Sequence, residues 1–264
     1  MRFICDHDLH IHSYVSPCSG DPEQNPDNIL KYAVENGFKT VCLTDHYWDD
    51  SVPSPYGTGA GQTTKAIRSV LPLPQAEGVR FLLGAETDMD RDFAIGVGPE
   101  MMRRLDFIVV PLNHLHMGGF SCRGDEGASE RAELIVRRFD ALLESDLPFH
   151  KVGLAHFTDG LIYTDGKNTD VLNLIPDSEY RRLFGKAAEL GIGVELNMDA
   201  LNMDREKDRD ELRIYEIARE EGCKFYYGSD AHTGKTLSRS KRNAEKIVDL
   251  LDLKEEDKFH IDQL

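Results

Sequence analysis

Cysteine is scarce in this chain, and the few cysteines lack the spacing that a cysteine-based framework requires. There are five among 264 residues, at positions 5, 18, 42, 122 and 223. An odd and scattered set argues against a secreted domain held by disulfides, and it has no close pair of the kind found in zinc knuckles. We therefore expect reduced thiols.

Basic residues are also few compared with acidic ones. The chain has 31 lysines and arginines against 47 aspartates and glutamates, a formal net charge of -16. Affinity for nucleic acid depends largely on basic side chains that neutralise phosphates, so the composition argues against a nucleic acid duplex as partner and favours a small substrate. Two or three bound divalent cations would make a cleft locally positive, which keeps anionic substrates compatible with the composition.

Long apolar runs are missing as well. The stretch Met1-Arg2-Phe3-Ile4-Cys5 meets acidic residues and histidines too soon to form the apolar centre of a signal peptide, and no run approaches the length of a bilayer span. We expect a soluble, cytoplasmic protein without a membrane partner. No linker divides the chain, so we expect one domain over residues 1–264. The oligomeric state is left open.

A strand followed by a helix is the unit that recurs along the chain. Apolar, β-branched runs predict strands at 2–12, 39–44, 79–85, 106–112, 151–155, 193–196 and 224–227. Helices are predicted at 26–37, 63–70, 99–105, 128–145, 178–190, 209–221 and 238–251, with an extra strand or hairpin at 88–98. Seven such units predict an α/β barrel, with a doubly wound open sheet as the alternative.

Metal-binding side chains follow nearly every predicted strand. His10 and His12 alternate in an extended strand, so both rings point the same way and can bind one ion. The other strand-end groups are Asp45, His46, Glu86, His114, His116, His156, Asp230 and His232. Parallel strands of a barrel end on one face, where barrel enzymes build their active sites. The pattern therefore predicts one shared metal site, and the spread over many strands favours a barrel over an open sheet.

Six short motifs in a fixed order resemble one known family. They are Asp8-Leu9-His10-Ile11-His12, Leu43-Thr44-Asp45-His46, Gly84-Ala85-Glu86, the His114 region, Ala155-His156 and Gly228-Ser229-Asp230-Ala231-His232. The ordered set resembles the PHP (polymerase and histidinol phosphatase) family over almost the whole chain. The resemblance implies a distorted seven-stranded TIM-like barrel and two or three divalent ions of zinc, manganese or iron. Phosphoester hydrolysis is the commonest activity that it implies.

The resemblance also implies a division of ligands among three metals. It groups His10, His12, Glu86 and Asp230 on one ion, lets Glu86 bridge to a second ion with His114 and His156, and assigns His46 and His232 to a third. Where the family often has a histidine or an aspartate after the paired histidines, this chain has Ser16-Pro17-Cys18-Ser19. Cys18 is therefore a candidate ligand, with fewer ligands or no third metal as alternatives. We favour His114 over His116 as a ligand, with His116 facing the substrate.

Other residues have expected roles around these ligands. Asp45 is expected to orient an imidazole by accepting its other N–H, and we count it with Glu86 and His232 as a candidate catalytic residue. Arg123 is the best-placed cation for a substrate phosphate, although a solvated loop arginine is an equal alternative. Glu195 and Asn197 share a strand face and fit a structural network or a substrate contact, and Tyr47 and Trp48 are candidates to line the pocket.

The leading functional hypothesis is hydrolysis of a small phosphate monoester, with histidinol phosphate as the natural example, by a hydroxide held between metals. No serine or cysteine has a recognisable paired base, so no covalent intermediate is expected. A nucleotide or oligonucleotide phosphodiesterase is the alternative enzyme. A non-catalytic metal-binding regulatory module is the alternative of another class, and the intact set of ligands argues against it.

Overall fold

Seven parallel strands form the centre of the computed structural model, which describes residues 1–163, 165–197 and 204–261, without the side chains of Arg239 and Ser240. The strands are β1 (His7–Ile11), β2 (Thr40–Leu43), β4 (Arg80–Thr87), β5 (Phe107–Val110), β6 (Val152–Leu154), β7 (Gly193–Leu196) and β8 (Lys224–Tyr227), and they pair in this order. A two-residue strand, β3 (His46–Tyr47), pairs with the end of β4, where His46 is the partner of Glu86.

The sheet closes almost completely between β1 and β8. The backbone N–H of Asp230 donates to the carbonyl of His10 at 2.8 Å, and that of His12 donates to Ala231 at 3.1 Å. Earlier along the seam a side chain takes the place of a carbonyl, because the N–H of Tyr227 donates to His7 Nε2 at 2.9 Å. The predicted distorted seven-stranded α/β barrel is confirmed.

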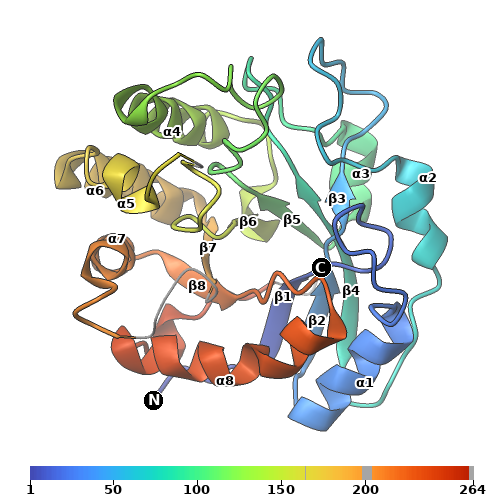
Figure 1. The fold of residues 1–264 in the computed structure, drawn as a ribbon. Coiled ribbons are helices and arrows are strands. Elements are labelled where there is room, and N and C mark those ends of the chain that lie inside the picture. Colours follow the sequence, from blue (N-terminus) through green and yellow to red (C-terminus); the bar gives the residue numbers. More distant parts are fainter. Residues whose placement is uncertain (164, 198–203, 262–264) are drawn as a thin grey trace.

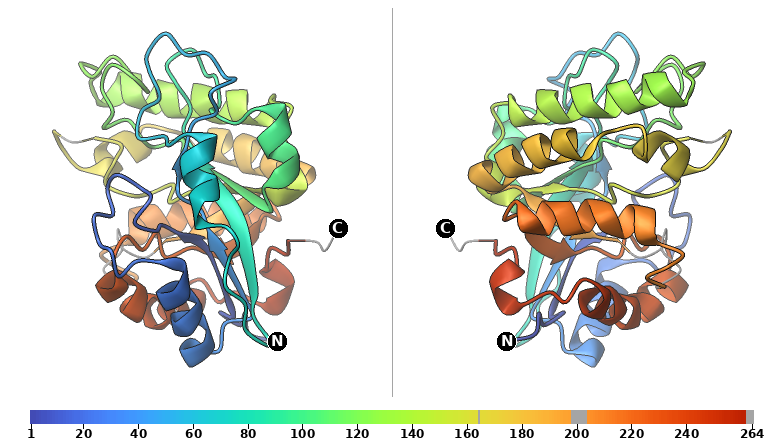
Figure 2. Two further views of the ribbon diagram at one scale, coloured as in Figure 1. Left: turned by 90° about the vertical axis from the view of Figure 1, so that its right-hand side faces the viewer. Right: turned by 90° about the vertical axis from the view of Figure 1, so that its left-hand side faces the viewer.

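Helices surround the barrel on its outside (Figures 1 and 2). They are α1 (Pro26–Asn36), α2 (Thr64–Ile67), α3 (Pro99–Arg104), α4 (Ala128–Leu143), α5 (Asn168–Leu172), α6 (Asp177–Leu190), α7 (Arg209–Glu220) and α8 (Gly234–Leu250). Short 3-10 turns lie at Arg68–Val70, Phe149–Lys151 and Glu255–Asp257. None of the described helices has the length and apolar character that a bilayer crossing requires.

Two apolar layers hold the barrel, because parallel strands bury both faces. The larger layer lies between the strands and the helices. The smaller one fills the inside of the barrel and consists of Leu9, Cys42, Leu82, Phe107, Val109, Ala155, Tyr226 and Phe259. Phe259 comes from the segment after α8, and its N–H donates to the carbonyl of Phe225 at 2.8 Å. This segment packs against the start of β8 and so fills the barrel at the N-terminal ends of the strands, opposite the C-terminal ends that carry the histidines.

Several element boundaries differ from the sequence-based ones. The first strand begins at His7, because Arg2 forms only an isolated bridge with Lys254. The segment 88–98 forms a short hairpin and no regular strand: Met89 and Ile95 make an antiparallel bridge, and the N–H of Asp90 donates to the carbonyl of Ala94 at 2.9 Å. Helix α8 begins at Gly234, four residues before the predicted start, because the Thr233 side chain accepts the N–H of Thr236 and caps it. Helix α5 is too short for a periodic pattern and was not predicted.

Candidate metal centre

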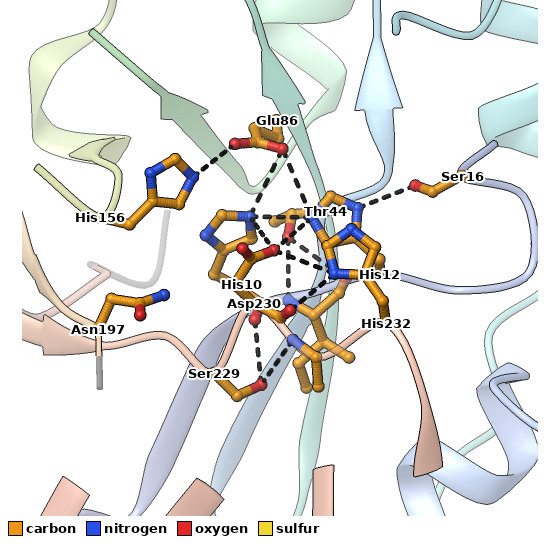
Figure 3. Close-up of polar contacts among 12 residues, drawn as sticks. His10, His12, Ser16, Thr44, Glu86, His156, Asn197, Ser229, Asp230 and His232 are labelled. Atoms are coloured by element: carbon orange, nitrogen blue, oxygen red, sulfur yellow. Dashed lines mark hydrogen bonds and ion pairs between the residues drawn. The ribbon is translucent and has the colours of Figure 1, made fainter. Parts of the chain in front are cut away.

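Six imidazoles and two carboxylates converge where the barrel strands end. Figure 3 shows four of the rings, those of His10, His12, His156 and His232, near Glu86 and Asp230. Their donor atoms form three sets, and within each set the atoms lie within 4.8 Å of one another. The first set is His10, His12 and Glu86, the second is Glu86, His114 and His156, and the third is His12, His46 and His232. The strand-end positions of these residues explain the convergence, because parallel strands bring their C-terminal ends to one face.

The carboxylate of Glu86 lies at the centre and faces two groups of rings with its two oxygens. Oε2 lies 2.8 Å from His46 Nδ1, 3.4 Å from His12 Nε2 and 3.7 Å from His10 Nε2. Oε1 lies 3.2 Å from His156 Nε2 and 3.7 Å from His114 Nε2. Glu86 is therefore the one group that the first and second sets share.

Asp230 approaches the first set from the opposite side of the barrel seam. Its Oδ1 lies 3.0 Å from His12 Nε2 and 3.6 Å from His10 Nε2. The residue has a φ of 49°, in the left-handed region that costs a non-glycine residue free energy. The preceding Gly228 has no side chain because a Cβ there would lie 2.7 Å from Glu195 Cδ and from His10 Cβ. This glycine lets Glu195 reach His10.

Five of the six imidazoles are held by their Nδ1 atoms, which leaves Nε2 directed to the centre. The acceptors are Glu195 for His10 (2.8 Å), Ser16 for His12 (2.9 Å), Asp88 for His114 (2.6 Å), Asn113 for His156 (3.0 Å) and the carbonyl of Asp230 for His232 (2.8 Å). A partner at Nδ1 fixes the tautomer with a lone pair on Nε2, as metal-binding histidines require. His46 differs, because its Nδ1 faces Glu86.

Three buried atoms of the cluster test whether a cation fits. Among the described residues, His46 Nδ1, Glu86 Oε2 and Asp230 Oδ1 are buried without a hydrogen-bond partner. A buried polar atom without a partner is costly, and a divalent cation would satisfy all three. Imidazole nitrogens and carboxylate oxygens are the donors that zinc, iron and manganese accept. The residues present therefore fit the metals that the family resemblance implies.

The electrostatics of the cluster also favour bound cations. Burial lowers the pKa of His156, but Glu86 and Asp230 outweigh it and raise the pKa to about 9. In contrast, burial and the neighbouring His232 lower the pKa of His12 to about 3. The carboxylates of Glu86 and Asp230 thus attract positive charge, while His12 stays neutral and able to bind a metal.

Cys18 lies beside the third set. Burial alone would raise the pKa of its thiol, but hydrogen bonds to His232 and His46 outweigh burial and lower the pKa to about 7. The next residue, Ser19, donates its hydroxyl to the carbonyl of His232 at 2.8 Å. The departure from the family pattern at Ser16-Pro17-Cys18-Ser19 therefore falls at the third set, with an exposed thiol next to two of its rings.

Asp45 does not contact an imidazole, so the predicted direct contact is wrong. Its Oδ1 accepts the backbone N–H of Ser13 and the hydroxyl of Ser16, each at 2.7 Å, and its Oδ2 accepts the hydroxyl of Ser13 at 2.7 Å. These donors belong to the loop after β1, which folds over the carboxylate and lies between it and the ring of His12. Asp45 acts on His12 only through Ser16.

The two predicted substrate contacts lie outside the cluster. His116 is exposed, and its ring meets that of His114 edge on at 5.2 Å between centroids. Arg123 is also exposed, and its guanidinium pairs with Asp125 and Glu130 at 2.9 Å each. His116 is thus next to the second set, whereas Arg123 is already paired with Asp125 in its own loop and with Glu130 in α4.

Tyr47 and Trp48 do not line a pocket, so this expectation is wrong. Both are buried, with exposed fractions of 0% and 2%. Tyr47 bonds to Thr64 through its hydroxyl, and Trp48 packs edge on against Phe120. The loop after β3 folds over them and makes them part of the support under the active-site loops.

Sequence reasoning missed the groups that hold His114 and His156. Asp88 follows Glu86 by two residues in an extended segment, so it shares the face of Glu86. Asn113 directly precedes His114, and its amide both holds His156 Nδ1 and donates to the His156 carbonyl at 2.7 Å. The two-residue spacing between Glu86 and Asp88 is a sequence signal from which the role of Asp88 could have been predicted. Glu195, in contrast, belongs to a network with His10, Tyr226 and Asn197, as the structural alternative expected.

The sequence model of the PHP domain family matches residues 8–261 of this chain. The chain belongs to the PHP domain family. Family membership and the three donor sets indicate a metal-dependent hydrolase of phosphoesters. A comparison with curated proteins found no match for this PHP domain.

Two solved structures share the fold of this PHP domain. One is histidinol phosphate phosphatase from Lactococcus lactis subsp. lactis in complex with zinc, L-histidinol and phosphate, at a TM-score of 0.61 and 14% identity, covering 97% of this chain and 99% of that one. The other is the putative histidinol phosphatase of Listeria monocytogenes, at a TM-score of 0.60 and 18% identity, covering 89% and 98%. At these identities the likeness shows a common fold.

Proposed function

We propose that this PHP domain hydrolyses a small phosphate monoester with the help of two or three divalent ions. The observation that carries the proposal is the position of Glu86, whose two oxygens face separate groups of imidazoles 2.8 to 3.7 Å away. Such an arrangement suits neighbouring cations that share one carboxylate. Bound there, divalent ions would polarise a phosphoryl oxygen and lower the pKa of a water molecule.

The residues of the chain divide the remaining tasks. His10, His12, Glu86 and Asp230 would hold the first ion, and Glu86 with His114 and His156 the second. His46 and His232 would hold a third ion, with Cys18 as a further ligand. With only the first two ions bound, His232, whose side chain is 27% exposed, would be the ring best placed to exchange a proton with a substrate or with solvent.

The substrate class rests on composition and on a neighbour. A net charge of -16 disfavours long nucleic acids, and the Lactococcus lactis enzyme, which shares the fold, was solved with L-histidinol and phosphate. We propose a small monoester of the histidinol phosphate kind. His116 would contact the substrate beside the second set, and Arg123 would do so only after leaving Asp125 and Glu130.

A substrate panel tests the activity. Phosphomonoesters that include histidinol phosphate, nucleoside monophosphates and phosphodiesters would be assayed with added manganese or zinc. We expect turnover of a small monoester, and loss of both turnover and bound metal in His12→Ala. His150→Ala is the matched control, because His150 is exposed and lies outside the cluster. Preferred cleavage of diesters would contradict the monoester proposal, and no cleavage with full metal content would favour a regulatory module.

Cys18 permits a separate test of the route. If it is a ligand or a loop residue, Cys18→Ser keeps appreciable turnover at saturating manganese, and direct attack by water inverts the configuration of a chiral thiophosphate substrate. If its thiolate attacks phosphorus, the S–P bond forms as the ester bond breaks, and water then releases phosphate from sulfur. Two inversions would retain configuration. Retention that disappears in Cys18→Ser would overturn direct attack by water.

A further inference from the structure

The hydroxyl of Ser16 lies at the junction of two ligand-bearing loops. Ser16 is 1% exposed and has three close partners. Its Oγ lies 2.7 Å from Asp45 Oδ1, 2.9 Å from His12 Nδ1 and 3.1 Å from the backbone nitrogen of His46. A hydroxyl has one proton to donate and two lone pairs to accept with, so these three contacts use its full capacity. Figure 3 shows Ser16 at the edge of the cluster, with its contact to the ring of His12.

The direction of these hydrogen bonds follows from the partners. Asp45 Oδ1 also accepts the backbone N–H of Ser13 at 2.7 Å, so this oxygen carries no proton and must accept from Ser16. The backbone nitrogen of His46 can only donate. The remaining lone pair of Ser16 therefore accepts a proton from His12, which requires the proton of the His12 ring to be on Nδ1. The lone pair of His12 is then on Nε2, which faces Glu86 and Asp230.

The same loop contacts all three residues of the third set. Ser16 contacts the ring of His12 and the backbone of His46, and Ser19 donates to the carbonyl of His232 at 2.8 Å. Hydroxyls three residues apart thus connect the segments after β1, β2 and β8.

We propose that Ser16, oriented by Asp45, is a positioning residue for metal binding. Its hydroxyl fixes the tautomer of His12 and holds the backbone of His46 beside that ring, so that one side chain positions two of the three residues in the third set. This inference rests on the proposed metal-dependent function. It assigns Asp45 an indirect role in place of the predicted direct contact with an imidazole.

The test compares two serines that share a carboxylate. Ser16→Ala removes the contact to His12, whereas the matched control Ser13→Ala removes a hydroxyl bond to Asp45 Oδ2 and no contact to a histidine. Ser16→Thr keeps the hydroxyl. Manganese and zinc affinities would be measured by calorimetry, and the tautomer of His12 by nitrogen NMR of the imidazoles in chelator-treated protein.

We expect Ser16→Ala to weaken the binding of at least one metal equivalent by about 10- to 100-fold, the range typical for losing a group that orients a metal-binding histidine. The Nδ1–H signal of His12 should give way to a mixture of tautomers. Ser16→Thr should restore both readouts, and Ser13→Ala should leave the tautomer unchanged.

Two results would overturn the inference. One is equal metal affinity and an unchanged His12 tautomer in Ser16→Ala, and the other is a parent protein whose His12 has its proton on Nε2. The second result needs no variant, so it stays decisive if Ser16→Ala does not fold. The parent could hydrolyse no phosphoester while Ser16→Ala still binds metal more weakly and no longer has the Nδ1–H tautomer of His12. In that case the proposed function fails and the positioning role stands.

Discussion

Glu86 Oε2 and His46 Nδ1 lie 2.8 Å apart, and neither atom has a hydrogen-bond partner among the described residues. The register of the sheet produces this contact, because His46 in β3 pairs directly with Glu86 in β4. Without the short strand β3, His46 would not be held beside the carboxylate. The contact connects the ring that belongs to the third set with the oxygen that serves the first set, so all three sets depend on Glu86.

Glu86→Gln tests this dependence. The amide keeps the shape of the side chain but loses the charge that neighbouring cations share, so we expect bound metal to fall to roughly half or less. The fold should persist, because the amide keeps one oxygen that can still face His156 Nε2, which lies 3.2 Å from Oε1. Metal per chain would be measured by plasma mass spectrometry after purification without chelators. Glu77→Gln, at an exposed glutamate before β4, is the control, and full metal content in Glu86→Gln would contradict the shared role.

Removal of metal should lower thermal stability. A ligand at 100 times its dissociation constant stabilises the folded state by about 2.7 kcal/mol. For a chain of this size, 1 kcal/mol corresponds to about 2–4 °C in Tm, so chelation should lower Tm by about 5–10 °C. Calorimetry with and without chelator measures the difference, which should shrink in His12→Ala. An identical Tm in both conditions would argue against metals that bind the folded state tightly.

The barrel could be predicted from local patterns, whereas the support of the ligands could not. The ranges 193–196 and 224–227 match β7 and β8 because short apolar runs bounded by glycine and turn residues have one stable arrangement in an α/β chain. The positions of the candidate ligands followed from the strand ends. The contact of Asp45 depends on how the loop after β1 folds over it, and no spacing in the sequence records that path.

The contacts of Arg138, on helix α4, are also not recorded in the local sequence pattern. An arginine is rarely buried unless its charge is paired, yet this side chain is completely buried on the same helix face as Ile135 and Phe139. Its guanidinium donates to the carbonyls of Leu112 at 2.9 Å and Ser121 at 3.2 Å, on both sides of the loop that carries His114. A longer contact of 3.4 Å reaches the carbonyl of Asp90, in the segment of Asp88. Only the tertiary structure brings these acceptors together.

Arg138→Lys should therefore loosen the second set. A lysine offers one compact charge in place of the planar fork, so several carbonyls lose their donor. We expect a loss of about 1–3 kcal/mol in the free energy of unfolding, together with weaker metal binding by the set of Glu86, His114 and His156. Urea unfolding and metal titration measure the two effects. Arg137→Lys is the neighbouring exposed control. Reduced stability with unchanged metal affinity would show that Arg138 supports the fold alone.

Asp6 connects the two ends of the chain below the barrel. Its carboxylate lies 3.0 Å from Lys258 Nζ, 3.1 Å from Lys39 Nζ and 3.6 Å from His7 Nδ1. Hydrogen bonding with His7, and then with Lys258 and Lys39, holds the pKa of Asp6 well below its usual range. The side chain of Lys258 is only 5% exposed, so it depends on Asp6 and Glu255 for compensation of its charge.

This depressed pKa predicts how acid affects stability. In the unfolded chain Asp6 titrates near the ordinary value of about 3.9, so its ionised form stabilises the fold fully above about pH 4. As pH falls below that value, the unfolded state takes up a proton that the folded state does not, and the contribution of Asp6 to stability declines by up to about 1.4 kcal/mol per pH unit.

Asp6→Asn should thus be less stable than the parent at neutral pH by about 1–3 kcal/mol, and this difference in stability, the gap between variant and parent, should narrow as the solution becomes more acidic. Urea unfolding of chelator-treated protein at about pH 7 and about pH 3 would measure the gap, with Asp50→Asn at an exposed aspartate as the control. A gap that stays constant between these conditions would show that Asp6 contributes no more to the fold as an anion than as a neutral acid.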